Sequence, residues 1–175
     1  YRITPDHQTD APASWEGTIV VPFALESALS GVQRLLKPNQ CLWYRRTLNY
    51  DPQPGQRTLL NFEAVDYECQ VFVNAKAVGS HRGGHTPFSV DITTAIQAGE
   101  NEIIVRVTDR TEMMQLRGKQ VLDPNGIWYT QVSGIWQTVW LESVSETYVR
   151  DCLIQTDAVA GTVTVTPRLV GNRAH

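Results

Sequence analysis

The sequence has few cysteines and no long apolar run, and each shortage excludes a class of protein. Its three cysteines, Cys41, Cys69 and Cys152, are odd in number and widely spaced. They fit neither a disulfide framework nor a zinc site, so we expect small buried hydrophobic side chains. No apolar run approaches the roughly 20 residues of a bilayer-spanning helix, and the N-terminus lacks the basic start and apolar core of a signal peptide. We therefore expect no membrane insertion.

Charge and helix signals are also in short supply. The formal net charge is -3, with 15 Lys and Arg against 18 Asp and Glu. This balance gives no electrostatic reason to expect nucleic acid as a partner. Helical patterns are limited to two short turns, at 26–29 and at 93–97, the second with Asp91 or Thr93 as a capping residue. No motif in the sequence calls for a cofactor.

Strand patterns, in contrast, fill most of the chain. Apolar and polar residues alternate with a period of two, which is typical of half-buried strands. Turn clusters such as 51–55 and 97–101 separate these segments. This spacing predicts an all-β protein built as an antiparallel sandwich. The expected strands are 17–21, 42–50, 57–64, 67–73, 88–92, 102–108, 148–156 and 161–169.

The pattern divides the chain at about residue 145. Residues 1–145 are long enough for one well-buried domain. Residues 146–175 contain only two alternating strands, and an isolated two-stranded hairpin is marginally stable in water. We expect these strands to begin a second β-domain. Because the chain starts at Tyr1 and ends soon after a strand, at 172–175, we also expect it to be a piece of a longer protein.

The segment 126–142, GIWYTQVSGIWQTVWLE, contains three of the five tryptophans. From Ile135 to Glu142 the alternation predicts a two-faced strand, and the run upstream of Ser133 is too irregular for helix or sheet. Tryptophan and tyrosine on a loop offer flat apolar surfaces with a polar edge. Such surfaces suit the faces of pyranose rings, and they equally suit packing at a sheet edge.

Two local features predict buried or strained geometry. Asn74-Ala75 stands where a hairpin turn favours Asn-Gly, because both positions need positive φ. Either the turn is of another type or it carries on the order of 1 kcal/mol of strain. Arg45 and Arg46 are adjacent in a predicted strand and point to opposite faces, so we expect one of them to face inward and pair with a carboxylate.

Two other motifs invite a catalytic or metal-binding interpretation. Asp66 and Glu68 are two residues apart in one predicted strand, which would place both on the same face roughly 7 Å apart. This geometry is common on solvated faces, so we do not assign catalysis to the pair. The segment 81–88 has two histidines flanking glycines but no evident third ligand. We expect it to be a scaffold turn, with glycines at a tight crossing and Phe88 in the core.

Six motifs occur in a fixed order along the chain and together resemble the N-terminal sugar-binding domain of glycoside hydrolase family 2, the β-galactosidase and β-glucuronidase family. The resemblance covers residues from 13 to 145, and it departs at Ala75, where the family usually has glycine. The motifs are WEGTIVVPFALESALSGV from Trp15, LWYRR from Leu42, FEAVDYECQVFVNAKAVGSHRGGHTPFSVDIT from Phe62, VRVTDR from Val105, RGKQ from Arg117 and SGIWQTVWLE from Ser133.

The resemblance implies an antiparallel jelly-roll β-sandwich, galactose-binding-like, followed by an immunoglobulin-like domain that residues 146–175 begin and then by a catalytic TIM barrel. The parent would be a retaining, β-galactosidase-like hydrolase of terminal β-glycosidic bonds, with carbohydrate as substrate. Its two catalytic glutamates, about 5 Å apart, would lie in the barrel, so no catalytic residue is assigned here. Oligomers are compatible with the family, which often works in the bacterial periplasm or cell envelope.

The resemblance also points to the long loop 109–132 as the functional segment. A structureless stretch of more than 20 residues in a compact domain is usually functional or disordered. In the family the corresponding loop leans over the barrel. The alternatives are that the loop only packs against other domains, that the chain is a stand-alone carbohydrate-binding module, or that it is a structural domain at an interdomain or subunit interface. Candidate contacts to substrate or barrel rim are Arg117, Lys119, Gln120, Asp123, Asn125, Trp128 and Tyr129.

Overall fold

The computed structural model describes residues 1–112 and 114–171. Met113 in the long loop and the expected chain end at 172–175 lie outside the described residues. Its regular elements are β1 Arg2–Pro5, the 3-10 helix η1 Ala28–Ser30, β2 Gln40–Tyr50, β3 Gln56–Phe62, β4 Val65–Asp66, β5 Glu68–Val73, β6 Lys76–Arg82, β7 Phe88–Asp91, β8 Gly99–Thr108, β9 Gln120–Val121, β10 Tyr129–Thr130, β11 Gly134–Ile135, β12 Val139–Ser145, β13 Tyr148–Asp157 and β14 Thr162–Val170.

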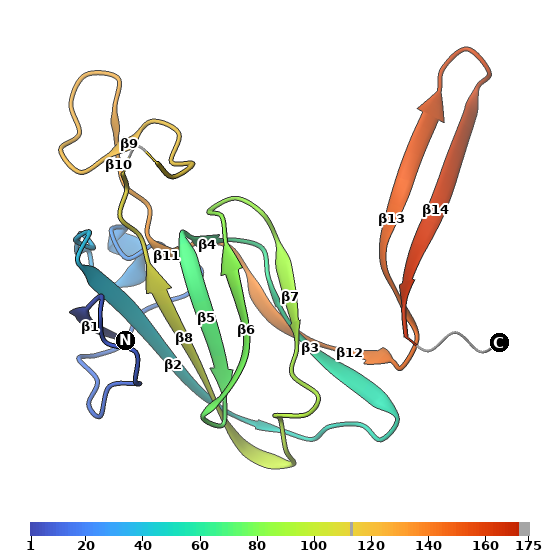
Figure 1. Ribbon diagram of the computed structural model, residues 1–175, viewed down its shortest axis with the longest axis horizontal. Coiled ribbons are helices and arrows are strands. Elements are labelled where there is room, and N and C mark those ends of the chain that lie inside the picture. Colours follow the sequence, from blue (N-terminus) through green and yellow to red (C-terminus); the bar gives the residue numbers. More distant parts are fainter. Residues whose placement is uncertain (113, 172–175) are drawn as a thin grey trace.

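Two antiparallel sheets form the body of the molecule (Figure 1). One sheet has the strand order β1-β2-β8-β5-β6, and the other has the order β12-β3-β7. Two-stranded pairings join β4 to β11 and β9 to β10, and β13 pairs with β14 as a separate hairpin. The predicted all-β sandwich is confirmed, and its core lies between the two main sheets.

The core follows from the alternation in the strands. Val71 and Val73 of β5 and Val105 and Val107 of β8 are buried, as the sequence pattern predicts. They belong to one apolar cluster with Leu60, Phe62 and Val90 from the smaller sheet. Burial of such side chains contributes roughly 1.5 to 3 kcal/mol each, so this cluster is the main source of the sandwich's stability.

Several expected elements differ from the structure. Residues 17–21 form no strand, because Val20 donates its N–H to the Ser30 carbonyl of η1 and Pro22 follows with no N–H to donate. The expected turn at 26–29 is η1, which starts two residues later, at Ala28, with Ser27 as its cap. The turn expected at 93–97 covers 93–95, and Asp91 accepts the Thr93 N–H at 3.0 Å, as a capping residue would.

The expected strand 135–142 is interrupted. β11 ends at Ile135 and β12 begins at Val139, and the two strands belong to different sheets. Between them, Trp136 donates its indole N–H to the Gly84 carbonyl at 2.8 Å. The chain therefore crosses from one sheet to the other over residues 136–138, which a period-two pattern does not reveal.

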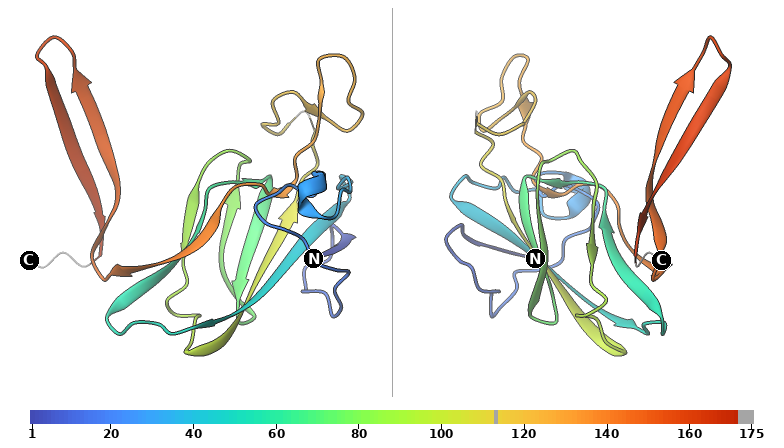
Figure 2. Two further views of the ribbon diagram at one scale, coloured as in Figure 1. Left: turned by 180° about the vertical axis from the view of Figure 1, so that it is seen from behind. Right: turned by 45° about the vertical axis from the view of Figure 1, so that its right-hand side comes forward.

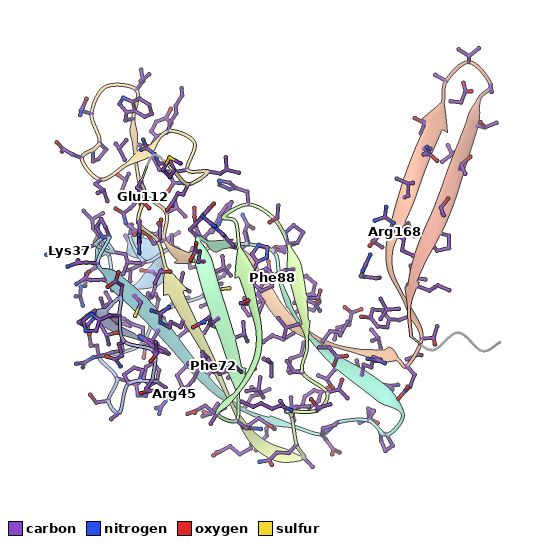
Figure 3. All side chains as sticks on the ribbon, in the orientation of Figure 1. Lys37, Arg45, Phe72, Phe88, Glu112 and Arg168 are labelled. Atoms are coloured by element: carbon purple, nitrogen blue, oxygen red, sulfur yellow. The ribbon has the colours of Figure 1, made fainter. Side chains whose placement is uncertain are left out.

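The expected buried arginine is absent from the described part of the chain. Arg45 and Arg46 are both exposed (Figure 3 labels Arg45). The Arg45 guanidinium lies 4.9 Å from the Trp15 ring centroid and 3.9 Å from the Glu102 carboxylate. Arg46 has the parity of the core residues Tyr44 and Leu48, but it is exposed beside an open pocket, so it stays hydrated and the buried ion pair we expected does not form.

The turn between β5 and β6 is of the type that favours Asn-Gly. Asn74 has φ of 48° and Ala75 has φ of 64°, so both turn residues adopt the left-handed conformation. The Asn74 side chain accepts the Glu102 N–H at 2.9 Å and donates to Asn101 at 2.8 Å. Asn74 is thus well supported, whereas Ala75 carries the strain that the sequence predicts.

Replacing Ala75 with glycine is expected to raise the free energy of unfolding by about 1 kcal/mol. Glycine removes the Cβ penalty of the left-handed conformation, although it also gains freedom in the unfolded chain. Urea unfolding measures the change. Ala98→Gly is the control, because Ala98 is exposed and does not have a positive φ. This substitution should lower the free energy of unfolding slightly. Equal destabilisation by both substitutions would contradict the strain assignment.

The β13–β14 hairpin extends away from the sandwich (Figure 2). Most of its side chains are exposed, including Cys152, whereas Cys41 and Cys69 are buried. The expectation of three buried cysteines is therefore wrong for Cys152, because no second layer covers the hairpin among the residues described. All three cysteines are free thiols.

Candidate functional site

The loop from β8 to β11 projects from one end of the sandwich, opposite the end that carries the hairpin (Figure 1). We expected this loop to be irregular. Instead, β9 and β10 pair in parallel within it, with Gln120 opposite Tyr129. The Tyr129 N–H also donates to the Lys119 carbonyl at 2.9 Å. These bonds close the tip of the loop on itself and give it a defined shape.

Asp109 anchors the start of this loop. Its carboxylate is buried and accepts the Thr111 N–H at 2.9 Å and the Gln115 amide at 2.6 Å. The Ser133 hydroxyl, at the far end of the loop, donates to the same carboxylate at 2.7 Å. One side chain therefore ties both ends of the loop together.

A second set of buried polar contacts joins the loop's far end to the segment around η1. Gln131 is buried and donates to the Leu36 carbonyl at 2.7 Å. The Ser133 N–H donates to the Glu26 carboxylate at 2.9 Å. Burial raises the pKa of Glu26, and its hydrogen bonds with Ser133 and with the Leu36 backbone act in the opposite direction. The base of the loop is thus a hydrogen-bonded network and not an apolar contact.

Asp66, in β4, lies beside this network and is less well satisfied. The residue is 1% exposed, and its Oδ1 atom has no hydrogen-bond partner among the residues described. Gln120 donates to the other oxygen at 3.4 Å, a long contact. Burial, helped by the charge of Asp109, raises the pKa of Asp66 to about 7.

Glycine is required where the 81–88 segment crosses Asp66. A Cβ on Gly84 would lie 2.5 Å from the Asp66 carboxyl carbon, so no other residue fits against that side chain. His81 stacks on Phe88 at 4.1 Å between ring centroids and contacts Thr86 at 3.1 Å. The segment therefore packs as the scaffold turn that we expected.

The expected pairing of Asp66 with Glu68 is wrong. β4 and β5 are separate elements in different sheets, so the parity of one does not continue into the other. Asp66 is buried, whereas Glu68 is exposed and forms an ion pair with Arg82 at 3.0 Å. The two carboxylates consequently point to different environments.

The structure brings together four of the seven predicted contact residues at the tip of the loop. The Arg117 guanidinium lies 5.9 Å from the Trp128 ring centroid, and the Lys119 ammonium lies 6.0 Å from that of Tyr129. Trp128 is 41% exposed and Tyr129 is 63% exposed. Each cation thus lies near the face of an aromatic ring that remains accessible to a ligand or another domain.

The other three predicted residues have different positions. Asp123 and Asn125 are exposed in the turn between β9 and β10, where the Asn125 amide donates to the Asp123 carbonyl at 3.2 Å. Gln120 is half-buried at the base, where it accepts the Val132 N–H at 2.6 Å and reaches Asp66. Gln120 is therefore the link between the loop and the buried carboxyl group.

A shallow hollow of about 400 Å³ lies beside this aromatic surface. Leu116, an apolar side chain that is 79% exposed, contributes to its lining. Trp136 does not contribute, because it is half-buried against the 81–88 segment, edge-on to His85 at 5.7 Å. The hollow is lined by His85, Gln115, Leu116, Arg117, Gly118 and Trp128.

Sequence reasoning did not select Glu26, Gln131 or Ser133, and it placed Asp66 on the wrong face. Their one visible signal is polarity next to apolar strand segments, which is too common to single them out. Within residues 1–112 and 114–171 no group of three or more His, Cys, Asp or Glu side chains is arranged to hold a metal ion. The same residues include no helix with the length and hydropathy needed to cross a bilayer.

Residues 7–144 match the profile of the sugar binding domain of glycosyl hydrolases family 2. The chain belongs to this family. The predicted resemblance is thereby confirmed, and the family 2 match ends close to the expected boundary at residue 145.

Relatives of this family 2 domain are much longer than the chain. A β-galactosidase of Thermoanaerobacter pseudethanolicus is 33% identical over 126 residues, which cover 69% of the chain and 16% of that protein. A β-galactosidase of Actinobacillus pleuropneumoniae is 30% identical over 159 residues, which cover 86% of the chain and 14% of that protein. The family 2 domain thus spans about a sixth or less of these relatives.

Solved structures confirm the fold. A β-glucuronidase of Bifidobacterium dentium, solved with coumarin-3-O-glucuronide, aligns with a TM-score of 0.67 at 21% identity, covering 88% of the chain and 31% of that protein. A β-glucuronidase of Bacteroides uniformis aligns with a TM-score of 0.62 at 23% identity, covering 75% of the chain and 18% of that protein. The predicted jelly-roll sandwich agrees with both.

Proposed function

We propose that this family 2 domain is a noncatalytic part of a retaining β-glycoside hydrolase, in which it braces a TIM barrel and lines the sugar pocket with the 109–132 loop. The observation that carries the proposal is the construction of that loop. Its base is held by buried hydrogen bonds that Asp109 accepts and Gln131 donates, and its tip presents cations and exposed aromatic rings beyond the sandwich.

The positions of the carboxyl groups support a noncatalytic role. Retaining hydrolysis needs an acid/base and a nucleophile about 5 Å apart and facing a common sugar site. In this chain Asp109 accepts several hydrogen bonds within the loop base, and Glu26 is committed to the Ser133 backbone. Groups bound in this way orient their neighbours, so we assign the bond-breaking steps to the barrel.

The hairpin supports a second domain beginning at residue 146. Apolar side chains on β13 and β14 are exposed, among them Ile154 at 62% and Leu169 at 65%. A hairpin with uncovered apolar residues is stable when further strands or a second layer cover it. We therefore propose that 146–175 begins an immunoglobulin-like domain.

The substrate we propose is a terminal β-linked galactose or a related β-sugar. The relatives named above are called β-galactosidases and β-glucuronidases, and both names describe hydrolysis of a β-glycosidic bond. An accessible aromatic ring beside a cation, as at Trp128 and Arg117, suits a pyranose ring with polar substituents.

The chain alone is expected to hydrolyse no glycoside, because the two carboxyl groups of the reaction lie in the proposed barrel. Incubation with nitrophenyl β-galactoside, β-glucoside and β-glucuronide, followed by absorbance of released nitrophenol, tests this. Turnover that co-purifies with the chain and disappears in an Asp66→Asn, Glu68→Gln double variant would refute the noncatalytic assignment.

The exposure of Trp128 and Tyr129 favours one second candidate, a domain that captures carbohydrate without the barrel. We expect free monosaccharide to bind no more tightly than about 1 mM, because a few contacts on an open surface must offset the lost freedom of the ligand. Isothermal calorimetry with galactose and glucuronic acid measures the constant. A micromolar value that Trp128→Ala abolishes would instead establish the binding module.

A further inference from the structure

A groove separates the outer face of the β12-β3-β7 sheet from the base of the β13–β14 hairpin. Its volume is about 690 Å³, within the range of small-ligand sites. Figure 3 labels Phe88 on the sheet side and Arg168 on the hairpin. None of its lining residues belongs to the 109–132 loop or to the hollow beside Trp128, so the groove is a separate site.

A tryptophan and two polar residues form a row across the floor of this groove. Trp140 of β12 is directly opposite Asn61 of β3, and Asn61 is directly opposite Ser89 of β7. Their neighbours Leu60 and Val90 are buried in the core, so the alternation turns the row to the outer face. Trp140 is 41% exposed there. A flat ring therefore lies next to hydrogen-bonding groups on a rigid sheet.

The polar side chains of the row are held in fixed orientations. Ser89 donates to the Asn61 carbonyl oxygen at 2.5 Å, and the Asn61 amide donates to the Glu142 carboxylate at 3.3 Å. Asn61 is 5% exposed, whereas Ser89 and Glu142 are exposed. The buried amide thus positions two accessible groups, and the Glu142 carboxylate keeps capacity to accept further hydrogen bonds.

The charges of the groove select the kind of ligand. Among its lining carboxylates, Asp91 is paired with Arg57 at 2.9 Å and Asp151 with Arg150 at 2.9 Å. Glu142 forms no ion pair with any residue in the described ranges. An uncompensated carboxylate repels an anion and favours hydroxyl donors, which form strong hydrogen bonds to it. A neutral polyhydroxylated ring fits this floor better than a uronic acid does.

We infer that this groove binds a neutral oligosaccharide, with one pyranose ring stacked on Trp140 and its hydroxyl groups bonded to Glu142 and Ser89. A ring on the indole buries apolar surface, and the polar row fixes its orientation. The binding itself uses neither the 109–132 loop nor a barrel, so it is independent of the proposed hydrolase. Its purpose rests on the proposed function: in that hydrolase the groove would hold a glycan chain at a distance from the reacting bond.

Titration of the whole chain with cellotriose and with β-1,4-linked galactotriose tests the inference, with glucuronic acid as the anionic comparison. The readout is the NMR signal of each tryptophan indole N–H, which separates Trp140 from Trp128. We expect a saturable shift of the Trp140 signal with a dissociation constant of about 1 mM for at least one trisaccharide. Glucuronic acid should produce no such shift.

Three variants make the test specific to the groove. The two Trp140 variants lack the indole signal, so their binding is read from the backbone amide signals of Ser89 and Glu142 in the groove. By that readout Trp140→Ala should weaken binding by at least about tenfold, and Trp140→Phe, which keeps an aromatic face, should weaken it less. Glu142→Gln should also weaken binding while leaving the sheet folded, because the amide still accepts the Asn61 hydrogen bond. Leu29→Ala, at an exposed position of η1 outside the groove lining and the 109–132 loop, is the control and should bind like the parent chain. If Trp140→Ala fails to fold, the other two groove variants decide.

Two results would overturn the inference. One is that neither trisaccharide produces a saturable Trp140 shift at concentrations up to about 20 mM. This concentration is well over ten times the expected dissociation constant. The other is binding that survives both Trp140→Phe and Glu142→Gln unchanged and is lost in Trp128→Ala. The second result would place the sugar on the loop and support the binding-module candidate, so the two proposals fail in different ways.

Discussion

In the proposed parent hydrolase, replacing Trp128 with alanine is expected to lower kcat/KM by roughly ten- to hundredfold, although we assign bond breaking to the proposed barrel. The Trp128 ring is accessible at the tip of a loop whose base is fixed by buried hydrogen bonds. A group that positions a sugar in the transition state typically contributes about 1 to 3 kcal/mol, which corresponds to this loss. Steady-state kinetics with a nitrophenyl β-glycoside measures it.

Asp123→Ala, at the turn of the same loop, is the companion substitution. Its side chain is exposed, so its removal should leave the melting temperature within about 1 °C while kcat/KM falls. Leu122→Ala, an exposed neighbour outside the predicted contact set, is the control and should preserve kinetics. If Trp128→Ala and Asp123→Ala both stay within about twofold of the parent in kcat and KM while the melting temperature falls, the loop serves interdomain packing.

The strands of the sandwich were predictable because their burial follows a two-residue period. Val71, Val105 and Val107 are buried as the alternation requires, and the strands 42–50, 88–92 and 148–156 occur within two residues of their expected limits. The same rule fails where the chain leaves a sheet. The period predicted one strand from Ile135 to Glu142, although the chain changes sheets between β11 and β12. It also predicted that Asp66 and Glu68 lie on one face, although β4 and β5 belong to different sheets.

The tip of the loop could be foreseen from composition, whereas its base could not. Aromatic and basic residues near one another in sequence, such as Arg117 and Trp128, also meet in space because β9 and β10 pair. The base instead assembles Glu26, Asp66, Asp109 and Gln131 from segments up to 105 residues apart in sequence. Such contacts depend on how the two sheets pack, and no local pattern encodes them.

The buried carboxyl group of Asp66 leads to the second large expected effect, on stability as a function of pH. Its pKa in the folded protein is about 7, above the value of about 3.9 in an unfolded chain. The folded state therefore binds a proton more tightly than the unfolded state. The stabilising contribution of this proton is complete below about pH 4 and is lost as the pH rises through 7.

Asp66→Asn should remove much of that loss, because asparagine resembles the protonated acid in shape and stays neutral. The carboxyl group faces Gly84 from the 81–88 segment and Gln120 from the loop, with the charges of Asp109 and Glu26 nearby. We compare the free energy of unfolding of the variant with that of the parent chain. The difference between them should favour the variant by about 1 to 3 kcal/mol more at pH 8 than at pH 5. Urea unfolding at pH 5, 6, 7 and 8 provides the four comparisons.

Glu68→Gln separates this effect from a general change in charge. Glu68 is exposed and paired with Arg82, so its loss should shift stability by less than about 1 kcal/mol with little dependence on pH between 5 and 8. Glu26, whose pKa is also raised by burial, contributes a loss of the same sign that both variants retain. The curve of Asp66→Asn should consequently be flatter than that of the parent chain without being level. If the stability–pH curves of Asp66→Asn and the parent chain are parallel, Asp66 is ionised throughout this range. The unsatisfied oxygen beside Gly84 would then require a hydrogen-bond donor supplied from outside the chain.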